Sequence, residues 1–472
     1  MKDDERSIQI LKCHDDHAPV CFSINNEGTE GIPSFKLEEG SHCPWVKKED
    51  QFGPDKLRSR IEPWLTALFQ SEHLSVLVGS GLTQGLHQMA AGEQLSGMNE
   101  ATFGIFDKEI NTKAKDSAIS AGRTKINIED QIRVSNELLR GLEVLASTKS
   151  TDSKEYEDVA TLQQALTSVL DDFTKSILKG ENGLISAEIE KREKAFNYLV
   201  SFLMSFASRS GTRDRLHIFT TNYDRCIEAG ADVAGLRLID RFVGTLVPIF
   251  RSSRLDVDMH YNPPGIRGEP RYLEGVARFT KLHGSVDWID YNKNIQRIGL
   301  PFGAEEIDPY LNAPGLKDAN ALQLMIYPNA SKDRETASYP YVELFRDLAA
   351  AICRPNSTLI CYGYSFGDEH INRVIEDMLT IPSAHLVIIS YGDPLGRIMY
   401  TYEKLGRPAQ ITLLIGDHLG DFQTLVDHYL PKPAIDRTTF RMAELLKARW
   451  GTVQNDEDAK TPKPTPEGDT VQ

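Results

Sequence analysis

The sequence lacks closely paired cysteines, long apolar runs and an excess of basic residues. No CxxC pair occurs among its six cysteines, and structural zinc sites usually take ligands in pairs about two to four residues apart, so neither a zinc ribbon nor another metal site is expected. No apolar run approaches the roughly 20 residues that span a bilayer. A formal net charge of −15 argues against a nucleic-acid-binding surface, which draws on clustered Lys and Arg.

The 472 residues, 40% of them hydrophobic, are enough for one large domain or two of ordinary size. The first residues, "MKDDERSIQILKCHDD", lack the apolar segment of a signal peptide, so the sequence predicts a cytoplasmic globular protein. A group of cysteines and histidines near the N-terminus has irregular spacing and no assigned role: Cys13, His14, His17, Cys21, His42 and Cys43.

The composition divides the chain into three parts. Residues 1–55 are polar and rich in Gly, Pro and charge, which indicates an irregular N-terminal extension. Residues 56–430 form the predicted domain, within which a helical period dominates from about 85 to 210 and predicts an all-helical insertion. Residues 431–472 begin with an amphipathic helical pattern and end in a polar tail that is expected to be disordered.

Apolar runs typical of strands flank the insertion. "HLSVLVGSGL" precedes it, and "LHIFTTN", "RFTKLHGSV", "LQLMIYP", "STLICYGYSF", "AHLVIIS" and "QITLLIG" follow it, with helical stretches between several of them. Strands without polar residues that alternate with helices are typical of a parallel sheet covered on both faces. The sequence therefore predicts an α/β fold, a Rossmann-like, doubly wound, mostly parallel sheet that carries the helical insertion.

Open α/β sheets bind ligands at the carboxyl ends of their strands, so the residues that follow each strand are informative. The first of these strands is followed by Gly79, Ser80, Gly81 and Thr83. Glycines at such a position let the backbone approach a diphosphate group near a helix N-terminus. A plain tight turn would explain the same residues equally well.

Three later strands also end in polar residues. "TTNYD" supplies Thr221, Asn222 and Asp224, although Asn222 or Asp224 alone could cap the helix that follows. "KLHGS" and "GYSFGDEHIN" supply the remaining candidates, which are His283, Gly284, Gly363, Ser365, Asp368 and Asn372. Independent caps and turns could explain each group separately, whereas together the groups predict one ligand-binding crevice.

The motifs "VGSGLT", "TTNYD", "KLHGS" and "GYSFGDEHIN", in this order, resemble the sirtuin-like NAD-consuming domain of bacterial anti-phage defence proteins, over about residues 70–395. The resemblance implies that Asn222 and His283 are the catalytic pair, and that the glycine loop and the Gly-x-Ser cluster hold NAD⁺ as the substrate. The residue types suit these roles, because an amide can hold a ribose hydroxyl and a water, and a histidine can take a proton near neutral pH.

The resemblance further implies an NAD⁺ glycohydrolase that converts NAD⁺ to nicotinamide and ADP-ribose, requires no metal, and depletes cellular NAD⁺ in abortive infection. Unrestrained activity would kill the host, so we expect activation by assembly into a homo-oligomer or by a partner, a HerA-type hexameric ATPase or a prokaryotic Argonaute. Hydrolysis and cyclisation of the ADP-ribose product both stay open. The alternatives are a non-catalytic NAD⁺ or ADP-ribose sensor and an NAD-dependent protein deacylase, which the missing zinc ribbon disfavours.

Overall fold

The chain divides into two compact units, Met1–Pro431 and Lys432–Gln472. The computed structural model describes residues 8–13, 15–25, 33–47, 50–95, 99–120, 125–209, 213–253, 257–261, 271–292, 294–312, 316, 324–326 and 339–432. The helix and the tail predicted for residues 431–472 therefore lie outside the described residues, except for Pro431 and Lys432.

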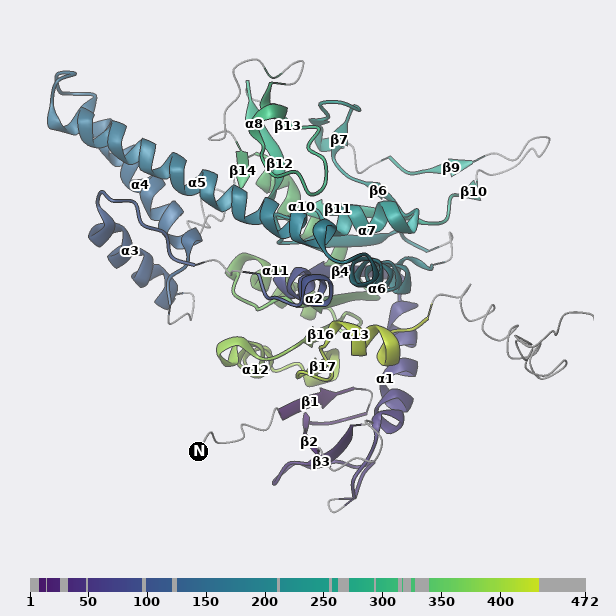
Figure 1. Cartoon of the computed structure of the whole chain (residues 1–472). Helices are drawn as coiled ribbons and strands as arrows, with labels where there is room; N and C mark the ends of the chain where they lie inside the picture. Colours follow the sequence, from purple (N-terminus) through teal and green to yellow (C-terminus); the bar gives the residue numbers. More distant parts are fainter. Residues whose placement is uncertain are drawn as a thin grey trace, which may run out of the picture. The chain divides into compact units, whose positions relative to one another are not determined.

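A ten-stranded sheet forms the centre of the first unit as far as the structure describes it, in the order β3-β2-β1-β17-β16-β15-β4-β5-β11-β6 (Figure 1). Every neighbouring pair from β17 to β6 is parallel, and the pairs that involve β1, β2 and β3 are antiparallel. The strands are β1 Ile8–Lys12, β2 Val20–Asn25, β3 Ser34–Leu37, β4 His73–Val78, β5 Leu216–Thr220, β6 Arg237–Ile239, β11 Val276–Lys281, β15 Ser357–Tyr362, β16 His385–Ser390 and β17 Ile411–Ile415.

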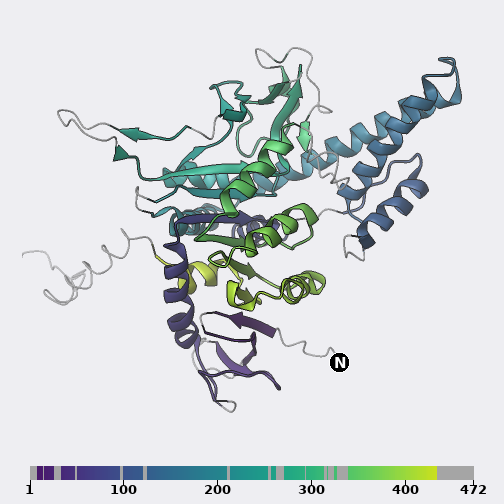
Figure 2. The same cartoon turned by 180° about the vertical axis from the view of Figure 1, so that it is seen from behind.

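Helices cover both faces of this sheet, because its parallel strands are apolar on both sides. All six residues of β15, for example, are buried. One hydrophobic core joins alternate strand residues to α1 Pro54–Phe69, α2 Ser80–Ala91, α6 Ile189–Ala207 and α7 Cys226–Ala234. The other joins the intervening residues to α10 Tyr341–Ile352, α11 Glu369–Leu379 and α12 Arg397–Leu405, which are seen from behind in Figure 2. The predicted α/β, doubly wound, mostly parallel fold is confirmed.

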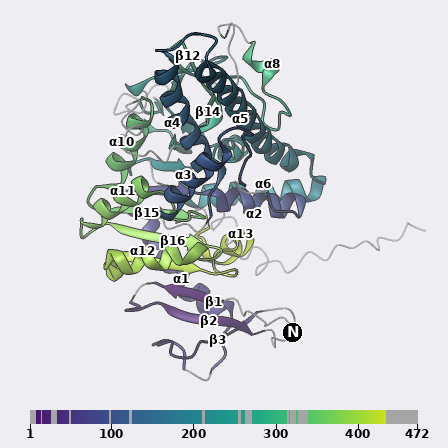
Figure 3. The same cartoon turned by 90° about the vertical axis from the view of Figure 1, so that its left-hand side faces the viewer.

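The predicted helical insertion contains two kinds of helix. Helices α2 and α6 pack on the main sheet, whereas α3, α4 and α5 share a separate core with the second sheet (Figure 3). These three helices are α3 Asp107–Ser120, α4 Ile128–Ala146 and α5 Lys154–Ser186. Helix α4 begins with a capping box, in which Asn127 accepts from the N–H of Asp130 and the Asp130 carboxylate accepts from the N–H of Asn127.

A second sheet has the order β14-β12-β13-β8-β7, and a separate two-stranded sheet pairs β9 with β10. These strands are β7 Phe242–Val243, β8 Ile249–Phe250, β9 His260–Tyr261, β10 Arg271–Tyr272, β12 Gly284–Tyr291, β13 Asn294–Arg297 and β14 Leu324–Ile326. The run "LQLMIYP" thus contributes β14 to the second sheet, antiparallel to β12 and not to the parallel sheet. Short helices complete the fold: α8 Asp308–Leu311, η4 Pro394–Gly396, η5 Pro408–Gln410, α13 Phe422–Thr424 and η6 Leu425–Tyr429.

The prediction that residues 1–55 form an irregular extension is wrong for the described part of that range. Strands β1, β2 and β3 extend the main sheet, and β1 pairs antiparallel with β17, with Ile10 opposite Ile415. Three aromatic rings anchor this segment, since Phe22 lies 5.3 Å from both Phe35 and Phe52 between ring centroids. Residues rich in Gly, Pro and charge surround these short strands and dominate the composition of the segment, which is why the sequence predicted an irregular extension.

Candidate functional site

Four neighbouring strands deliver all the predicted site residues. The order β15-β4-β5-β11 is continuous and parallel, so the carboxyl ends of these strands meet at one edge of the sheet. Each group of candidates follows one of these strands. The structure therefore brings the four motifs to a single edge, which we call the strand-end site.

Asn222 connects the end of β5 to the glycine loop after β4. Its Nδ2 donates to the carbonyl oxygen of Gly79 and to Oγ1 of Thr83, both at 3.0 Å. Thr83 in turn donates to Oδ2 of Asp224 at 2.7 Å. Asn222 is 8% exposed, and its Oδ1 has no hydrogen-bond partner among the described residues. Both amide donors are thus used by the protein, and one acceptor remains for a ligand.

Asp224, and not Asn222, binds the first turn of the helix that follows, whose N-cap residue is Arg225. The Oδ1 of Asp224 accepts from the backbone N–H of Cys226, the first residue of α7, at 3.0 Å. The interpretation of Asn222 as a helix cap is therefore wrong. Asp224 is also held from β11, since the buried Lys281 donates to its carbonyl oxygen. Asp224 thus fixes the junction, with both carboxylate oxygens engaged by protein donors.

His283 lies at the end of β11 and pairs with Asp368, which precedes α11. Its Nε2 is 2.8 Å from Oδ2 of Asp368, and the side chains are 20% and 13% exposed. The Oδ1 of Asp368 accepts from the N–H groups of His370 and Ile371, so the same carboxylate caps α11. The Nδ1 of His283 has no hydrogen-bond partner among the described residues. Since a carboxylate next to Nε2 favours the proton on that nitrogen, Nδ1 is left as an acceptor.

The two glycine loops touch each other. The N–H of Gly79 donates to the carbonyl oxygen of Tyr362, and the N–H of Gly81 donates to that of Gly363. Gly363 has φ of +61°, and a Cβ there would lie 2.6 Å from the Cα of Gly81. These glycines therefore serve the contact between the loops, and the N–H of Gly81 is already used. Gly81 and Gly363, which the sequence predicts to bind NAD⁺, therefore also have a structural role.

The remaining candidates differ in their freedom to bind a ligand. The hydroxyls of Ser80, Thr221 and Ser365 have no hydrogen-bond partner among the described residues, and all three side chains are exposed or half-buried. Asn372 is engaged inside its own loop, where it donates to the carbonyl oxygen of Phe366. Gly284, with φ of +88°, is the first residue of β12 and directly follows His283.

Sequence reasoning missed Arg397, which lies against the "GYSFGD" loop. A Cβ on Gly367 would lie 2.8 Å from Nη1 of Arg397 and 3.4 Å from Oγ of Ser365. The guanidinium therefore adds positive charge beside a free hydroxyl, as a diphosphate group would require. The available signal was an arginine at the start of the helix that follows β16.

The sequence also did not predict two interactions, an ion pair and a hydrogen bond, that connect the helical insertion to the β5–α7 junction. Arg225 and Glu181 of α5 form a buried ion pair, in which the Glu181 carboxylate also accepts from the N–H of Arg225 at 2.8 Å. The hydroxyl of Tyr223 donates to Glu129 of α4 at 3.2 Å. Burial raises the pKa of this phenol well above its usual value, and the negative charge of Glu129 raises it further. The residues on either side of Asp224 are thus fixed by α4 and α5.

No group of three or more His, Cys, Asp or Glu side chains in the described ranges is arranged to hold a metal ion. The described cysteines of the N-terminal cluster, Cys13, Cys21 and Cys43, are free thiols. His14 of that cluster lies outside the described residues. No helix among the described residues is long and apolar enough to cross a bilayer.

Residues 216–406 match the family model described as SIR2-like domain, which is less than half of the chain. The span contains Asn222, His283 and Asp368, while the glycine loop at residues 79–83 precedes it. This part of the protein is therefore similar to SIR2-like domains. The loop joins that domain in space, because β4 lies between β15 and β5.

Among solved structures, the chain is similar to a Sir2 variant determined with a deacetylated p53 peptide and 3′-O-acetyl ADP-ribose. The TM-score is 0.29 at 14% sequence identity, over 77% of this chain and 96% of that one. A comparison with the sequences of curated proteins found no match.

Proposed function

We propose that the protein is an NAD⁺ glycohydrolase in which Asn222 and His283 act on the ribose next to nicotinamide. The observation that carries the proposal is the pair of acceptors left over at the strand-end site. Among the residues that the structure describes, Oδ1 of Asn222 and Nδ1 of His283 have no hydrogen-bond partner, while every other polar atom of these two side chains is held. The two residues follow the neighbouring parallel strands β5 and β11. Two acceptors at these strand ends suit a reaction that consumes one water, because one can orient the water or the ribose and the other can accept a proton.

The chemistry asks little of the protein beyond position. Nicotinamide is a good leaving group, and its departure shifts positive charge onto the ribose in an oxocarbenium-like state. Oδ1 of Asn222 would accept a hydrogen bond from a ribose hydroxyl or from the water, and would place a partial negative charge near the developing cation. His283 would accept a proton through Nδ1, and Asp368 would stabilise the resulting imidazolium. Water adds to the ribose, which releases nicotinamide, ADP-ribose and a proton.

The diphosphate of NAD⁺ would lie along the two glycine loops. Free hydroxyls at Ser80 and Ser365 and the guanidinium of Arg397 are the groups that could bind it. The contact between the loops would fix their spacing before NAD⁺ arrives, so little conformational freedom would be lost on binding.

Resemblance supports a role as an anti-phage effector that depletes NAD⁺ and is activated by homo-oligomer assembly or by a partner. A HerA-type hexameric ATPase is our first candidate for the partner, and a prokaryotic Argonaute the second. Nicotinamide release by the purified chain, measured alone and with its genetic neighbour, tests this role. Full activity in a dilute, strictly monomeric preparation would refute the proposed activation.

A non-catalytic NAD⁺ or ADP-ribose sensor is the second candidate. One observation favours it: both donors of Asn222 engage protein acceptors, as they would in a purely structural residue. Calorimetric binding of NAD⁺ without nicotinamide release, in the presence of the activating partner, would support the sensor. Loss of nicotinamide release in folded Asn222→Ala and His283→Ala, with NAD⁺ binding retained, would support the enzyme.

A further inference from the structure

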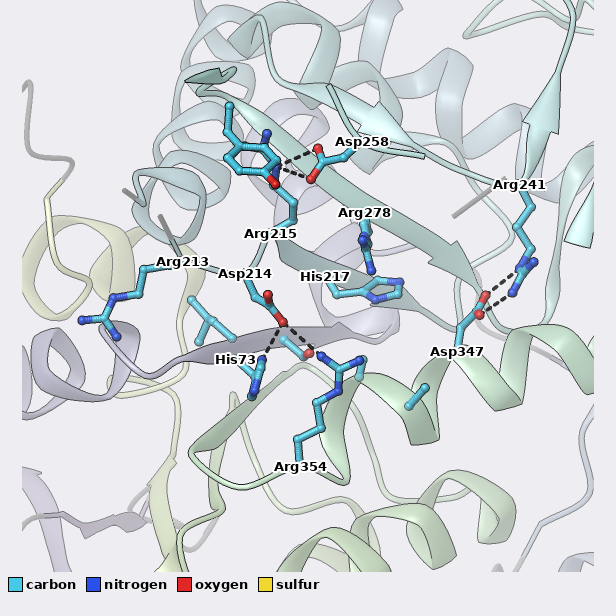
Figure 4. Close-up of a pocket in the computed structure, with 15 residues that line it drawn as sticks. His73, Arg213, Asp214, Arg215, His217, Arg241, Asp258, Arg278, Asp347 and Arg354 are labelled. Carbon is cyan, nitrogen blue, oxygen red and sulfur yellow. Dashed lines mark hydrogen bonds and ion pairs between the residues drawn. The ribbon is translucent and has the colours of Figure 1, made fainter. Parts of the chain in front are cut away.

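A second candidate site lies at the opposite edge of the parallel sheet. A cavity of about 350 Å³ opens near the amino-terminal ends of β4, β5 and β11 (Figure 4). Its lining includes His73 of β4, His217 of β5 and Arg278 of β11. A strand of five residues at about 3.3 Å per residue separates it from the strand-end site by about 15 Å. The volume falls within the range of about 300–1,000 Å³ that is typical of small-molecule sites.

The cavity is rich in arginine in a protein of net charge −15. Five arginines line it against three aspartates: Arg213, Arg215, Arg241, Arg278 and Arg354, with Asp214, Asp258 and Asp347. Three of the arginines have carboxylate partners: Arg215 pairs with Asp258 at 3.0 Å, Arg354 with Asp214 at 3.0 Å, and Arg241 with Asp347 in a bidentate arrangement. Arg213 and Arg278 have no carboxylate partner among the described residues, so two positive charges are left over.

Arg278 is one of the two unpaired arginines, and it lies inside the cavity. It has no hydrogen bond or ion pair among the described residues, and its Nε is buried. Figure 4 shows it between His217 and the Arg215–Asp258 pair. Leaving a buried guanidinium nitrogen without an acceptor is costly, so an anion that accepts from it would remove this cost.

The neighbouring histidine adds no charge of its own to the cavity. His217 is 6% exposed, and its Nε2 bonds to Oγ1 of Thr280 at 2.9 Å. Burial lowers the pKa of His217 well below its usual value, and three of the surrounding arginines lower it further. A neutral imidazole leaves the arginines as the charged groups that a ligand would meet.

We propose that this cavity binds a phosphate or diphosphate group of a small molecule, at a site separate from the strand-end site. Guanidinium groups match phosphate oxygens in geometry and bind them through paired hydrogen bonds. Arg278 is a half-buried contact whose Nε is buried, and Arg354 is an accessible contact at 43% side-chain exposure. The existing carboxylate pairs hold the other guanidinium groups in place, so the site is built before the anion arrives.

Isothermal titration calorimetry on the full chain tests the proposal, with inorganic diphosphate and ADP as separate probes. Arg278→Gln and Arg354→Gln are each expected to weaken binding at least tenfold, as loss of a charge-assisted hydrogen bond predicts. Arg58→Gln is the matched control, because Arg58 is exposed, pairs with Glu62 and is not part of the cavity lining. Tighter binding of ADP than of diphosphate would identify a nucleotide, and equal binding would identify the diphosphate group alone.

Competition separates this site from the strand-end site. Saturating NAD⁺, added to an Asn222→Ala variant so that it is not consumed, is expected to leave the Arg278-dependent binding in place. Displacement of diphosphate by NAD⁺ to the same extent in the wild type and in Arg278→Gln would overturn the proposal, as would no saturable binding of either probe or binding unaffected by both cavity variants. Circular dichroism checks the fold, and Arg354→Gln decides the outcome if Arg278→Gln does not fold, since exposed ion pairs contribute little to stability. The proposal does not depend on NAD⁺ hydrolysis, because binding alone is measured.

Discussion

Asp368→Asn separates two roles of one carboxylate. Oδ1 of Asp368 caps α11 through the N–H groups of His370 and Ile371, while Oδ2 faces Nε2 of His283 at 2.8 Å. An asparagine can keep the cap through its carbonyl oxygen, because Asn and Asp are similar N-cap residues. Its amide group, however, donates toward Nε2 where the carboxylate accepted. The proton of His283 would then move to Nδ1, which removes the proposed base.

The expected effect is on turnover. Loss of a proton-transfer group commonly costs about 10²- to 10⁴-fold, so kcat for nicotinamide release should fall by that amount in Asp368→Asn. KM for NAD⁺ should change much less, since Asp368 is proposed to act through His283 as a positioning residue. Stability should stay close to wild type, whereas Asp368→Ala should lose about 1 kcal/mol more because the cap is removed as well.

The assay is chromatographic measurement of nicotinamide release, in whichever preparation of the wild type shows turnover. Urea unfolding of both variants provides the control for the cap. A wild-type kcat in Asp368→Asn with a raised KM would refute the reasoning. That result would make Asp368 a ligand of NAD⁺, the role that the sequence predicts for it.

Three further predictions concern stability and metal content. Gly363→Ala should destabilise the fold by about 2–4 kcal/mol in urea unfolding, because its Cβ would lie 2.6 Å from the Cα of Gly81 at a positive φ; a loss below 1 kcal/mol would show that the loops can separate. Burial lowers the pKa of His418 to about 4, below an unfolded value of about 6.5, so its share of stability is present above pH 6.5 and is lost as pH falls toward 4. His418→Gln should therefore reduce the loss of unfolding free energy between pH 7 and pH 5 by about 2 kcal/mol, and an unchanged loss would contradict the assignment. Elemental analysis is expected to find no stoichiometric zinc, and one zinc per chain that tracks activity would overturn this expectation.

The sequence predicted those features that depend on one strand and the residues directly after it. Apolar runs such as β15 identify themselves as buried parallel strands, and parallel strands necessarily present their carboxyl ends at one edge. That is why Asn222, His283 and Asp368 could be grouped without knowing the strand order. The assignment of Asn222 and His283 as catalytic stays a prediction.

The sequence could not predict features that depend on which strands become neighbours. Strands β1–β3 are short and gain their stability from pairing with β17, whose partner residues lie some four hundred positions away. The pair of His283 and Asp368 links two motifs that are far apart in the sequence. Helix capping alone explains an aspartate at position 368, so the sequence gives no sign that its side chain also binds His283. The arginine cavity has no local motif at all, because its lining comes from segments between residues 73 and 354.

The polar residues at the β5–α7 junction show how a ligand-binding site can be inferred from a cluster of polar side chains. The abundance of hydrogen-bonding groups there points to a ligand, yet most of these groups bind the protein itself: Thr220 donates to the carbonyl oxygen of Val78, Asn222 holds the glycine loop, and Asp224 accepts from the first N–H of α7. What remains is one amide oxygen and, on the next strand, one imidazole nitrogen. Among the described residues at the opposite edge, the same comparison leaves Arg213 and Arg278 without carboxylate partners. Groups that the fold leaves without partners, more than the number of polar residues, therefore define where ligands are expected and what chemistry they meet.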